Sequence, residues 1–391
     1  MRVMIANLAW TGHHLHFASL LCRSVREAGH TPVLVTPRGT VAAREYSVYA
    51  AEGSFDGVEL NESDPIDSYK GVISGIRASK RILADTARWV KRTRCDRLWL
   101  HFADQLTNAV YIPGAARLEV PCAALHLRGG YAYPTNSLRS RAVYAYARQA
   151  TLQAPWDHLW HLDHLAHQVL RERSQRIALM PEPVESPLSI TQVDARRELG
   201  LPIDDRLLMV LGALDSRKGV VELMRAFRDA APYRTRLVLM GLLYPDVKDA
   251  VMSLSNELGI ERCIVRDVML SQRDFSLGFA ASDWQALPYR QHIGSSGILV
   301  RAAAYGRPVL ASDWGWIGQA TQQFGLGSTC DTSSNESIVE GIHRLVAAPT
   351  LASAQASRFA NFNTEHNFCA HWSRTLEGEI GVPNPAYLPW S

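Results

Sequence analysis

The amino-acid sequence predicts an α/β protein made of two domains, each built on a parallel β-sheet. Short apolar runs typical of strands alternate with longer amphipathic patterns typical of helices, and this alternation favours parallel sheets covered by helices. The chain has 391 residues, more than one compact core usually accommodates. The segment Met180–Pro187 contains three prolines and cannot continue a regular element, so we place the linker between the domains there.

We expect one Rossmann-like domain over residues 1–182 and a second over residues 183–365. The N-terminal domain opens with a βαβ unit, which indicates a parallel sheet. Its expected strands are Arg2–Leu8, Thr31–Thr36, Arg97–Phe102, Pro121–His126 and His158–Leu162. Its expected helices are Leu15–Ala28, Ser68–Thr93, Leu138–Gln153 and a last one that ends at Arg173.

The C-terminal domain repeats the same alternation. Its expected strands are Leu207–Gly212, Arg236–Met240, Cys263–Val268, Trp284–Leu287 and a buried run from Val309. Its expected helices are Val220–Asp229, Asp246–Leu258, Gln272–Ser282, Glu336–Ala347 and Ala352–Phe362. We expect residues 366–391 to form a final helix and a tail that pack back across the linker.

Composition and charge exclude several classes of protein. Hydrophobic residues make up 47% of the chain and charged residues 20%, as in ordinary soluble globular proteins. The formal net charge of +3 is small for this length, which argues against a dedicated nucleic-acid binder. The six cysteines show no paired spacing, and no run of about 18 apolar residues could span a membrane. We therefore expect a cytoplasmic protein with reduced thiols, with peripheral contact at the inner membrane face left open.

The segment Gly294-Ser295-Ser296-Gly297 is a turn of small residues at the start of a helical pattern. Such a turn exposes backbone N–H groups at the positive end of the helix dipole, where anions and above all phosphates bind. The four residues are therefore candidate ligands of a nucleotide diphosphate.

A second candidate site follows the strand that ends at Gly212. Arg217 and Lys218 stand in the turn between this strand and a helix that begins after Gly219. In an open α/β sheet, ligands bind outside the carboxyl ends of the strands. Two cations at this position would stabilise a diphosphate leaving group, although a solvated basic turn has the same sequence pattern.

Together these segments resemble the donor-binding domain of GT-B glycosyltransferases, in particular retaining family 4. That family has a Gly-Arg-Leu-x-x-x-Lys-Gly turn, which the sequence matches at Gly212, Leu214, Lys218 and Gly219. The later signature of that family, with two glutamates before Gly-x-Pro-Val, is similar in frame to Ile293–Val309. The resemblance covers residues 195–325 well and the N-terminal half loosely. It implies two Rossmann-like domains that face each other across a cleft, with the donor in the C-terminal domain.

The sequence departs from this family at three positions. Ala213 replaces the arginine of the turn, and Arg217 could supply a guanidinium instead. Ile293 and Arg301 stand where the family has glutamates that contact the transferred sugar and the ribose hydroxyls. Because arginine cannot accept hydrogen bonds, either the ribose is recognised differently or the donor is different. His292 is the candidate for the sugar contact, and Arg301 stays a donor-site candidate with a surface arginine as the alternative.

In the N-terminal domain, the resemblance implies a glycine-rich loop that closes over the donor phosphate and the acceptor. Gly12, His13 and His14 lie after the first strand, and glycine allows the backbone to approach a ligand. We assign Gly12 and His13 to the donor and His14 to the acceptor. The resemblance also implies a histidine near the sugar at the end of a later strand, which is His101 in this sequence. His101 joins Arg217 and Lys218 as a catalytic candidate.

Asp104, His126 and Arg128 follow the ends of two strands and are further candidates for acceptor contacts. Four histidines recur every third residue, at positions His158, His161, His164 and His167. This spacing does not keep them on one helix face, so we predict no metal site. The resemblance likewise implies that no bound metal is needed.

We expect a hexosyltransferase-like glycosyltransferase of the kind found in polysaccharide biosynthesis. Its donor is a UDP- or GDP-sugar, and it transfers the sugar with retention to a glycan, a lipid-linked saccharide or a small molecule. The missing glutamates leave open an inactive GT-B protein that binds nucleotide or glycan or partners an active transferase. A sugar-nucleotide epimerase or an inverting GT-B transferase is a further alternative. A Rossmann dehydrogenase is disfavoured because no Gly-x-Gly-x-x-Gly follows the first strand.

Overall fold

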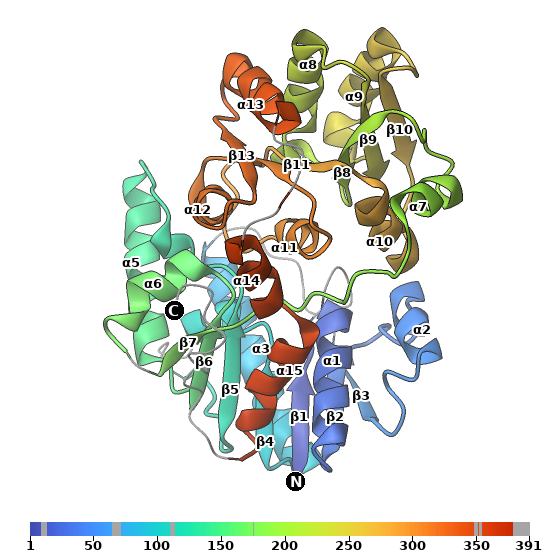
Figure 1. Ribbon diagram of the computed structural model, residues 1–391. Coiled ribbons are helices and arrows are strands. Elements are labelled where there is room, and N and C mark those ends of the chain that lie inside the picture. The colour runs from blue at the N-terminus through green and yellow to red at the C-terminus, as the bar shows by residue number, and fades with distance from the viewer. Residues whose placement is uncertain are drawn as a thin grey trace. The chain divides into compact units, whose positions relative to one another are not determined.

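The computed structural model describes residues 1–8, 14–64, 72–109, 114–174, 176–347, 351 and 354–377. The chain forms two compact units (Figure 1). The first comprises Met1–Pro183 together with helix α15 (Glu365–Arg374), and the second comprises Val184–Thr364. Within the described residues, no helix is long and apolar enough to cross a membrane.

The first unit contains a parallel sheet of seven strands in the order β3-β2-β1-β4-β5-β6-β7. The strands are β1 (Arg2–Ala6), β2 (Thr31–Pro37), β3 (Glu59–Ser63), β4 (Arg97–Leu100), β5 (Cys122–His126), β6 (His158–His161) and β7 (Ile177–Leu179). Besides α15, the helices are α1 (His14–Glu27), α2 (Arg44–Ala51), α3 (Val72–Thr93), α4 (Asp104–Ala109), α5 (Leu138–Gln153) and α6 (His164–Arg171), with a 3-10 turn η1 (Gly130–Ala132).

Both faces of this sheet are buried, as is usual for parallel strands. Successive residues of β1 point to opposite faces, so Ile5 packs in one core cluster and Met4 in the other. Trp372 of α15 belongs to the first of these clusters and is fully buried. Its ring centroid lies 4.7 Å from that of Trp160 and 5.2 Å from that of Trp99. Helix α15 therefore completes the core of the first unit, although it follows the second unit in the chain.

The second unit contains a parallel sheet of six strands in the order β10-β9-β8-β11-β12-β13. The strands are β8 (Arg206–Leu211), β9 (Thr235–Gly241), β10 (Cys263–Asp267), β11 (Trp284–Leu287), β12 (Val309–Ser312) and β13 (Gly327–Cys330). The helices are α7 (Gln192–Glu198), α8 (Val220–Ala230), α9 (Pro245–Leu258), α10 (Gln272–Ala281), α11 (Gly297–Ala304), α12 (Gly315–Gln323), α13 (Asn335–Ala347) and α14 (Ala354–Phe362), with a 3-10 turn η2 (Ser216–Lys218).

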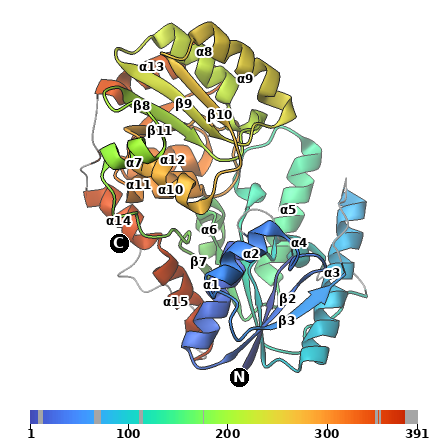
Figure 2. The ribbon, with the colours of Figure 1, turned by 90° about the vertical axis from the view of Figure 1, so that its right-hand side faces the viewer.

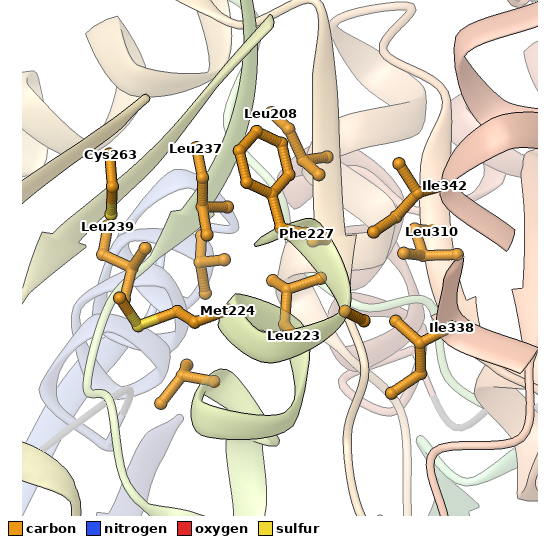
Figure 3. Packing of buried hydrophobic residues seen from close by; sticks show 14 of the residues in the cluster. Leu208, Leu223, Met224, Phe227, Leu237, Leu239, Cys263, Leu310, Ile338 and Ile342 are labelled. Atoms are coloured by element: carbon orange, nitrogen blue, oxygen red, sulfur yellow. The ribbon is translucent and has the colours of Figure 1, made fainter. Parts of the chain in front are cut away.

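Helices α8, α9 and α13 cover one face of this sheet (Figure 2). Leu223 and Phe227 lie one helical turn apart on α8 and pack with Leu208 and Leu237 of the sheet (Figure 3). Each of the four side chains is at most 1% exposed. Burying one such side chain contributes about 1.5–3 kcal/mol, so this core holds the strand ends in fixed positions.

The structure confirms the predicted α/β class with two parallel sheets, but the sequence pattern misses several short elements. These are α2, β3, α4, β7, α7, α12 and β13. Strands β3 and β13 lie at sheet edges, where pairing on one side requires fewer apolar residues and the hydrophobic signal is weak. Strand β7, also at an edge, is apolar but only three residues long. The helix predicted from Ser68 begins at Val72 in the described part of the chain, because residues 65–71 lie outside it.

The strand order reverses at one place in each sheet. In the first unit this switch point lies between β1 and β4, and in the second unit between β8 and β11. The connections from the two central strands run in opposite directions there, which opens a crevice beyond the carboxyl ends of the strands. Ligands of open α/β sheets usually bind at this position, so each unit has one expected site.

Candidate functional site

The turn after β8 and the loop after β11 meet at the switch point of the second sheet. Lys218 Nζ donates a hydrogen bond to Tyr289 Oη over 2.6 Å and lies 4.2 Å from the centroid of the tyrosine ring. Lys218 is 9% exposed, and no carboxylate of the described residues forms an ion pair with it. A largely desolvated cation held by a neutral partner can bind an anionic ligand.

The backbone fixes the turn that carries Lys218. Asp215 caps η2, and its carboxylate accepts the backbone N–H of Lys218 at 3.2 Å. Gly219 follows with a φ of +63°, and a Cβ there would lie 2.1 Å from a carbonyl oxygen of the β11 loop. Glycine therefore permits the η2 turn to lie close to the loop after β11. In this contact the Arg290 N–H donates to the Arg217 carbonyl oxygen at 2.8 Å. The two segments that predict donor binding are hydrogen-bonded to each other.

His292 joins Arg217 to the start of helix α11. Arg217 Nη1 lies 3.2 Å from His292 Nδ1, and His292 Nε2 lies 2.9 Å from the Ser295 carbonyl oxygen. A carbonyl oxygen can only accept, so the proton is on Nε2, and Nδ1 accepts from the guanidinium. The histidine is thus a neutral imidazole that sets the position of Arg217 relative to the turn.

The segment Gly294–Gly297 opens helix α11. Ser296 is the N-cap, and its hydroxyl accepts the Leu299 N–H at 3.4 Å. Gly294 has a φ of +101°, a conformation that favours glycine. The first N–H groups of a helix have no intrahelical partner and lie at the positive end of its dipole. With Arg217 nearby, this turn is an electropositive position suited to a diphosphate.

A pocket of about 490 Å³ lies beside these cations at the carboxyl ends of β8, β11, β12 and β13. Its lining includes Arg217, Arg290, Asp313 and Asp331. Burial and the neighbouring Asp331 raise the pKa of Asp313. A hydrogen bond from Ser333 lowers the pKa of Asp331. The pocket therefore offers cations for phosphate and carboxylates for hydroxyl groups, which together suit a nucleotide.

Arg301 makes a bidentate ion pair with Glu185. Its Nε and Nη2 donate to the two carboxylate oxygens at 2.9 and 2.7 Å, and the two side chains are 16% and 18% exposed. Glu185 belongs to the proline-rich segment predicted to be the linker, so the pair ties α11 to the beginning of the second unit. A contact between Arg301 and a ribose stays a prediction.

A buried hydrogen-bond chain occupies the switch point of the first sheet. His101 is fully buried after β4, and its Nε2 lies 3.1 Å from Oδ1 of Asn7, which follows β1. Asn7 Nδ2 in turn donates to Thr36 Oγ1 at 3.0 Å. His14 stacks on Phe102 with centroids 3.5 Å apart and meets the edge of His101 at 6.2 Å. The structure thus brings His14 and His101 together, while Gly12 and His13 lie outside the described residues.

The three other acceptor candidates have different surroundings. Asp104 accepts the backbone N–H groups of Leu127 and Arg128 at 3.0 and 2.9 Å and so anchors the loop after β5. His126 is 3% exposed, its Nε2 lies 2.7 Å from Thr107 Oγ1, and burial lowers its pKa. Every residue of β5 is buried, and Thr107, the hydrogen-bond partner of His126, belongs to α4. A contact between His126 and the acceptor stays a prediction. The Arg128 side chain is exposed.

The four histidines spaced by three residues are divided between β6 and α6. Burial is the main cause that lowers the pKa of each, to about 4 for His167. In the part of the chain that the structure describes, no group of three or more His, Cys, Asp or Glu residues could hold a metal ion.

Sequence reasoning missed Tyr289 and Asn7, the hydrogen-bond partners of two predicted catalytic side chains. Tyr289 comes two residues after β11, and Asn7 comes directly after β1. Both are polar side chains that follow a strand at the switch point, and this position is the signal that could have found them.

Comparisons with known proteins identify the fold. No protein-family profile matches the sequence. D-inositol 3-phosphate glycosyltransferase of Rhodococcus erythropolis is 29% identical over 187 residues, which is 44% of this chain and 41% of that protein. The match thus spans less than half the length of this curated relative.

Three solved structures resemble the chain over nearly its whole length. Sucrose-phosphate synthase from Thermosynechococcus elongatus superposes with a TM-score of 0.71 at 14% identity, covering 97% of this chain and 98% of that one. Anabaena HepE in complex with UDP superposes with a TM-score of 0.68 at 13% identity, covering 97% of this chain and 100% of that one. WaaG, a glycosyltransferase of lipopolysaccharide biosynthesis, superposes with a TM-score of 0.55 at 15% identity, covering 100% of this chain and 98% of that one.

The chain has the GT-B fold. The likeness includes both units, so the GT-B assignment applies to the sheet of the first unit as well as to that of the second. At these identities the structural likeness establishes the fold alone. The chemistry of this GT-B protein has to be inferred from its own residues.

Proposed function

We propose that this GT-B protein is a glycosyltransferase that binds a nucleotide-diphosphate sugar in its second unit. The observation that carries the proposal is the cluster of Lys218, Arg217 and the α11 N-terminus at the switch point. These three positive groups match the needs of a diphosphate, whose charge increases as its bond to the sugar breaks. The HepE structures that contain UDP, and UDP with glucose, favour a UDP-sugar over a GDP-sugar as donor.

The pocket beside Arg217 would hold the nucleoside. Its carboxylates, Asp313 and Asp331, would accept the ribose hydroxyls, the task that Arg301 cannot perform. The diphosphate would lie between this pocket and the sugar. Gly212 after β8, and Ser295 with the other residues of the turn before α11, would leave room for it.

Sugar transfer breaks the bond between the anomeric carbon and a phosphate oxygen and forms a bond from that carbon to an acceptor hydroxyl oxygen. The diphosphate leaves with the electron pair of the broken bond, and the hydroxyl proton passes to the departing phosphate oxygen. Lys218 and Arg217 are held in place by Tyr289 and His292 before the reaction, so they would stabilise this charge without reorganising. We propose that they do so without a bound metal, that His101 lies near the sugar, and that the configuration is retained as in family 4.

We propose that the first unit binds the acceptor through His14 and Arg128, while Gly12 and His13 contact the donor. The names of several similar proteins contain a phosphorylated polyol or sugar, namely D-inositol 3-phosphate, sucrose-phosphate and trehalose-phosphate. They favour a small phosphorylated acceptor over a long glycan. Peripheral membrane contact belongs to the proposal only if the acceptor is lipid-linked.

One observation favours a second candidate function, a GT-B protein that binds nucleotides but does not transfer sugars. Ile293 provides no carboxylate for the sugar, and the Arg301 guanidinium is bound to Glu185. If these changes abolish transfer, the phosphate-binding groups of the second unit would still bind a nucleotide.

Calorimetry with UDP, GDP and ADP, followed by a screen of nucleotide sugars for turnover, separates the two candidates. We expect UDP binding and turnover of a UDP-sugar, both weakened in Lys218→Ala and unchanged in Lys248→Ala, an exposed lysine paired with Asp267. Nucleotide binding without turnover would favour the second candidate. Absence of any nucleotide binding would contradict both.

A further inference from the structure

A second pocket, of about 280 Å³, lies within the first unit between η1 and helix α5. Three tyrosines and two arginines dominate its lining: Tyr131, Tyr133, Tyr144, Arg141 and Arg148. No acidic side chain contributes to the lining, and α5 carries no acidic residue. The pocket is therefore both aromatic and positively charged.

The two arginines lack acidic partners. Arg148 makes no hydrogen bond or ion pair with any described residue, and Arg141 donates only from Nε, to the Thr135 carbonyl oxygen at 3.2 Å. Arg141, Tyr144 and Arg148 are spaced by three and four residues, so they lie on the same face of α5. Other arginines of the chain are neutralised, as in the bidentate pair of Arg301 with Glu185. Two guanidinium groups that have no acidic partner among the described residues and line one pocket attract an anion.

The tyrosines form a fixed wall. Tyr131 Oη lies 3.1 Å from His161 Nε2, and Tyr133 Oη donates to Asp163 at 3.2 Å. Burial raises the pKa of Tyr131 well above its usual value, so the phenol stays neutral. A Cβ on Gly130 would lie 3.0 Å from the Tyr144 ring, so this glycine allows the ring to pack closely over η1. The hydroxyls of Tyr131 and Tyr133 are hydrogen-bonded to His161 and Asp163. The aromatic rings offer flat apolar surfaces to a ligand.

We infer that this pocket binds a phosphorylated saccharide, with Arg141 and Arg148 on the phosphate and the tyrosine rings against the sugar. Guanidinium groups pair with phosphate through two parallel hydrogen bonds, and sugar rings present apolar C–H faces to aromatic side chains. The inference rests on the proposed function, because it makes this pocket the acceptor subsite of the transferase. The acceptor is then a sugar phosphate, and Arg141 and Arg148 select it.

The test is calorimetric titration of the full chain with hexose monophosphates, with the unphosphorylated hexoses, and with inorganic phosphate alone. We expect a hexose monophosphate to bind at least ten times more tightly than the matching hexose and than inorganic phosphate. Arg148→Gln and Arg141→Gln should each weaken this binding at least tenfold. Arg139→Gln is the matched control, because Arg139 is exposed on the same helix and does not line the pocket. Equal affinity for phosphorylated and plain sugars, no binding of any hexose monophosphate, or an equal loss in the control would overturn the inference.

Two further measurements separate this inference from its alternatives. UDP titration of the same variants should give wild-type affinities, because the donor site is assigned to the second unit. UDP binding without sugar-phosphate binding would overturn the pocket inference alone, while the reverse would overturn the proposed donor site alone. Flotation with phosphatidylcholine vesicles, with and without phosphatidylglycerol, tests whether the phosphate belongs to a lipid headgroup. Arginine-dependent binding to anionic vesicles that hexose monophosphates do not displace would contradict a saccharide ligand.

Discussion

Lys218 of the η2 turn and Tyr289 of the β11 loop are joined by a hydrogen bond of 2.6 Å across the switch point of the second sheet. The lysine belongs to the turn after β8, and the tyrosine belongs to the loop after β11, 71 residues further along the chain. The bond holds a largely buried ammonium at the carboxyl ends of the strands, where a diphosphate is proposed to bind.

Replacing Lys218 by alanine tests the proposed phosphate contact. Since one preorganised donor to a developing charge is typically worth roughly 10²–10³-fold in rate, we expect kcat with a competent UDP-sugar to fall by that order. Steady-state kinetics measure the loss, and Lys248→Ala should behave as wild type. Unchanged turnover of Lys218→Ala would remove this residue from the mechanism.

Tyr289→Phe keeps the ring and removes the hydroxyl. The ammonium then loses a hydrogen bond worth about 1.5–3 kcal/mol to a charged donor and is no longer fixed above the strand ends. We expect UDP affinity and kcat to fall less than in Lys218→Ala, with almost no further loss in the double variant. Full additivity of the two changes would show that the tyrosine acts independently of the lysine.

The Arg301–Glu185 pair should stabilise the second unit. Breaking a partly buried bidentate pair leaves one charge without its partner, so Arg301→Gln and Glu185→Gln should each cost about 1–3 kcal/mol, with a clear coupling energy in the double variant. Urea unfolding measures these differences. The exposed pair Arg273–Glu198 is the control and should be worth below about 1 kcal/mol. A coupling no larger than in the control would contradict the stabilising role.

Trp372 tests whether α15 is part of the first core. Its ring packs against Trp99 and Trp160 and is fully buried, so Trp372→Ala should destabilise the first unit by about 3–5 kcal/mol. Tryptophan fluorescence during urea unfolding should show an earlier transition for that unit. His366→Ala changes an exposed residue on the same helix and should leave the transition in place. An unshifted transition in Trp372→Ala would mean that α15 does not contribute to this core.

The buried carboxyl of Asp163 should make stability depend on pH. Burial raises its pKa to about 6, although hydrogen bonds from Gly129, Ala166, Tyr133 and Leu165 oppose the shift. Because the folded pKa lies above the unfolded pKa of 3.8, the stability that protonated Asp163 contributes is fully present below the unfolded pKa and is lost as pH rises through about 6. Asp163→Asn should remove this dependence between about pH 4 and 6, as measured by thermal unfolding across that range. An equally steep pH dependence in the variant would place the titrating group elsewhere.

The alternation of strands and helices was predictable because each core strand and amphipathic helix carries its own hydrophobic period. The turn that opens α11 was predictable because glycine and serine before an apolar helix, as in Gly294–Gly297, favour a helix N-terminus. The edge strands β3 and β13 were not predictable from the sequence. Their stability comes from pairing with a neighbouring strand and not from their own side chains.

The sequence by itself determined the two-sheet α/β architecture, the small-residue turn that opens α11 and the basic turn at Arg217 and Lys218. Only the tertiary structure decided which partners these groups have. It paired Lys218 with Tyr289, Arg217 with His292 and Arg301 with Glu185. The physical reason is that the local sequence pattern encodes secondary structure, whereas contacts between side chains 71 to 116 positions apart depend on how the strands are ordered in the folded sheet.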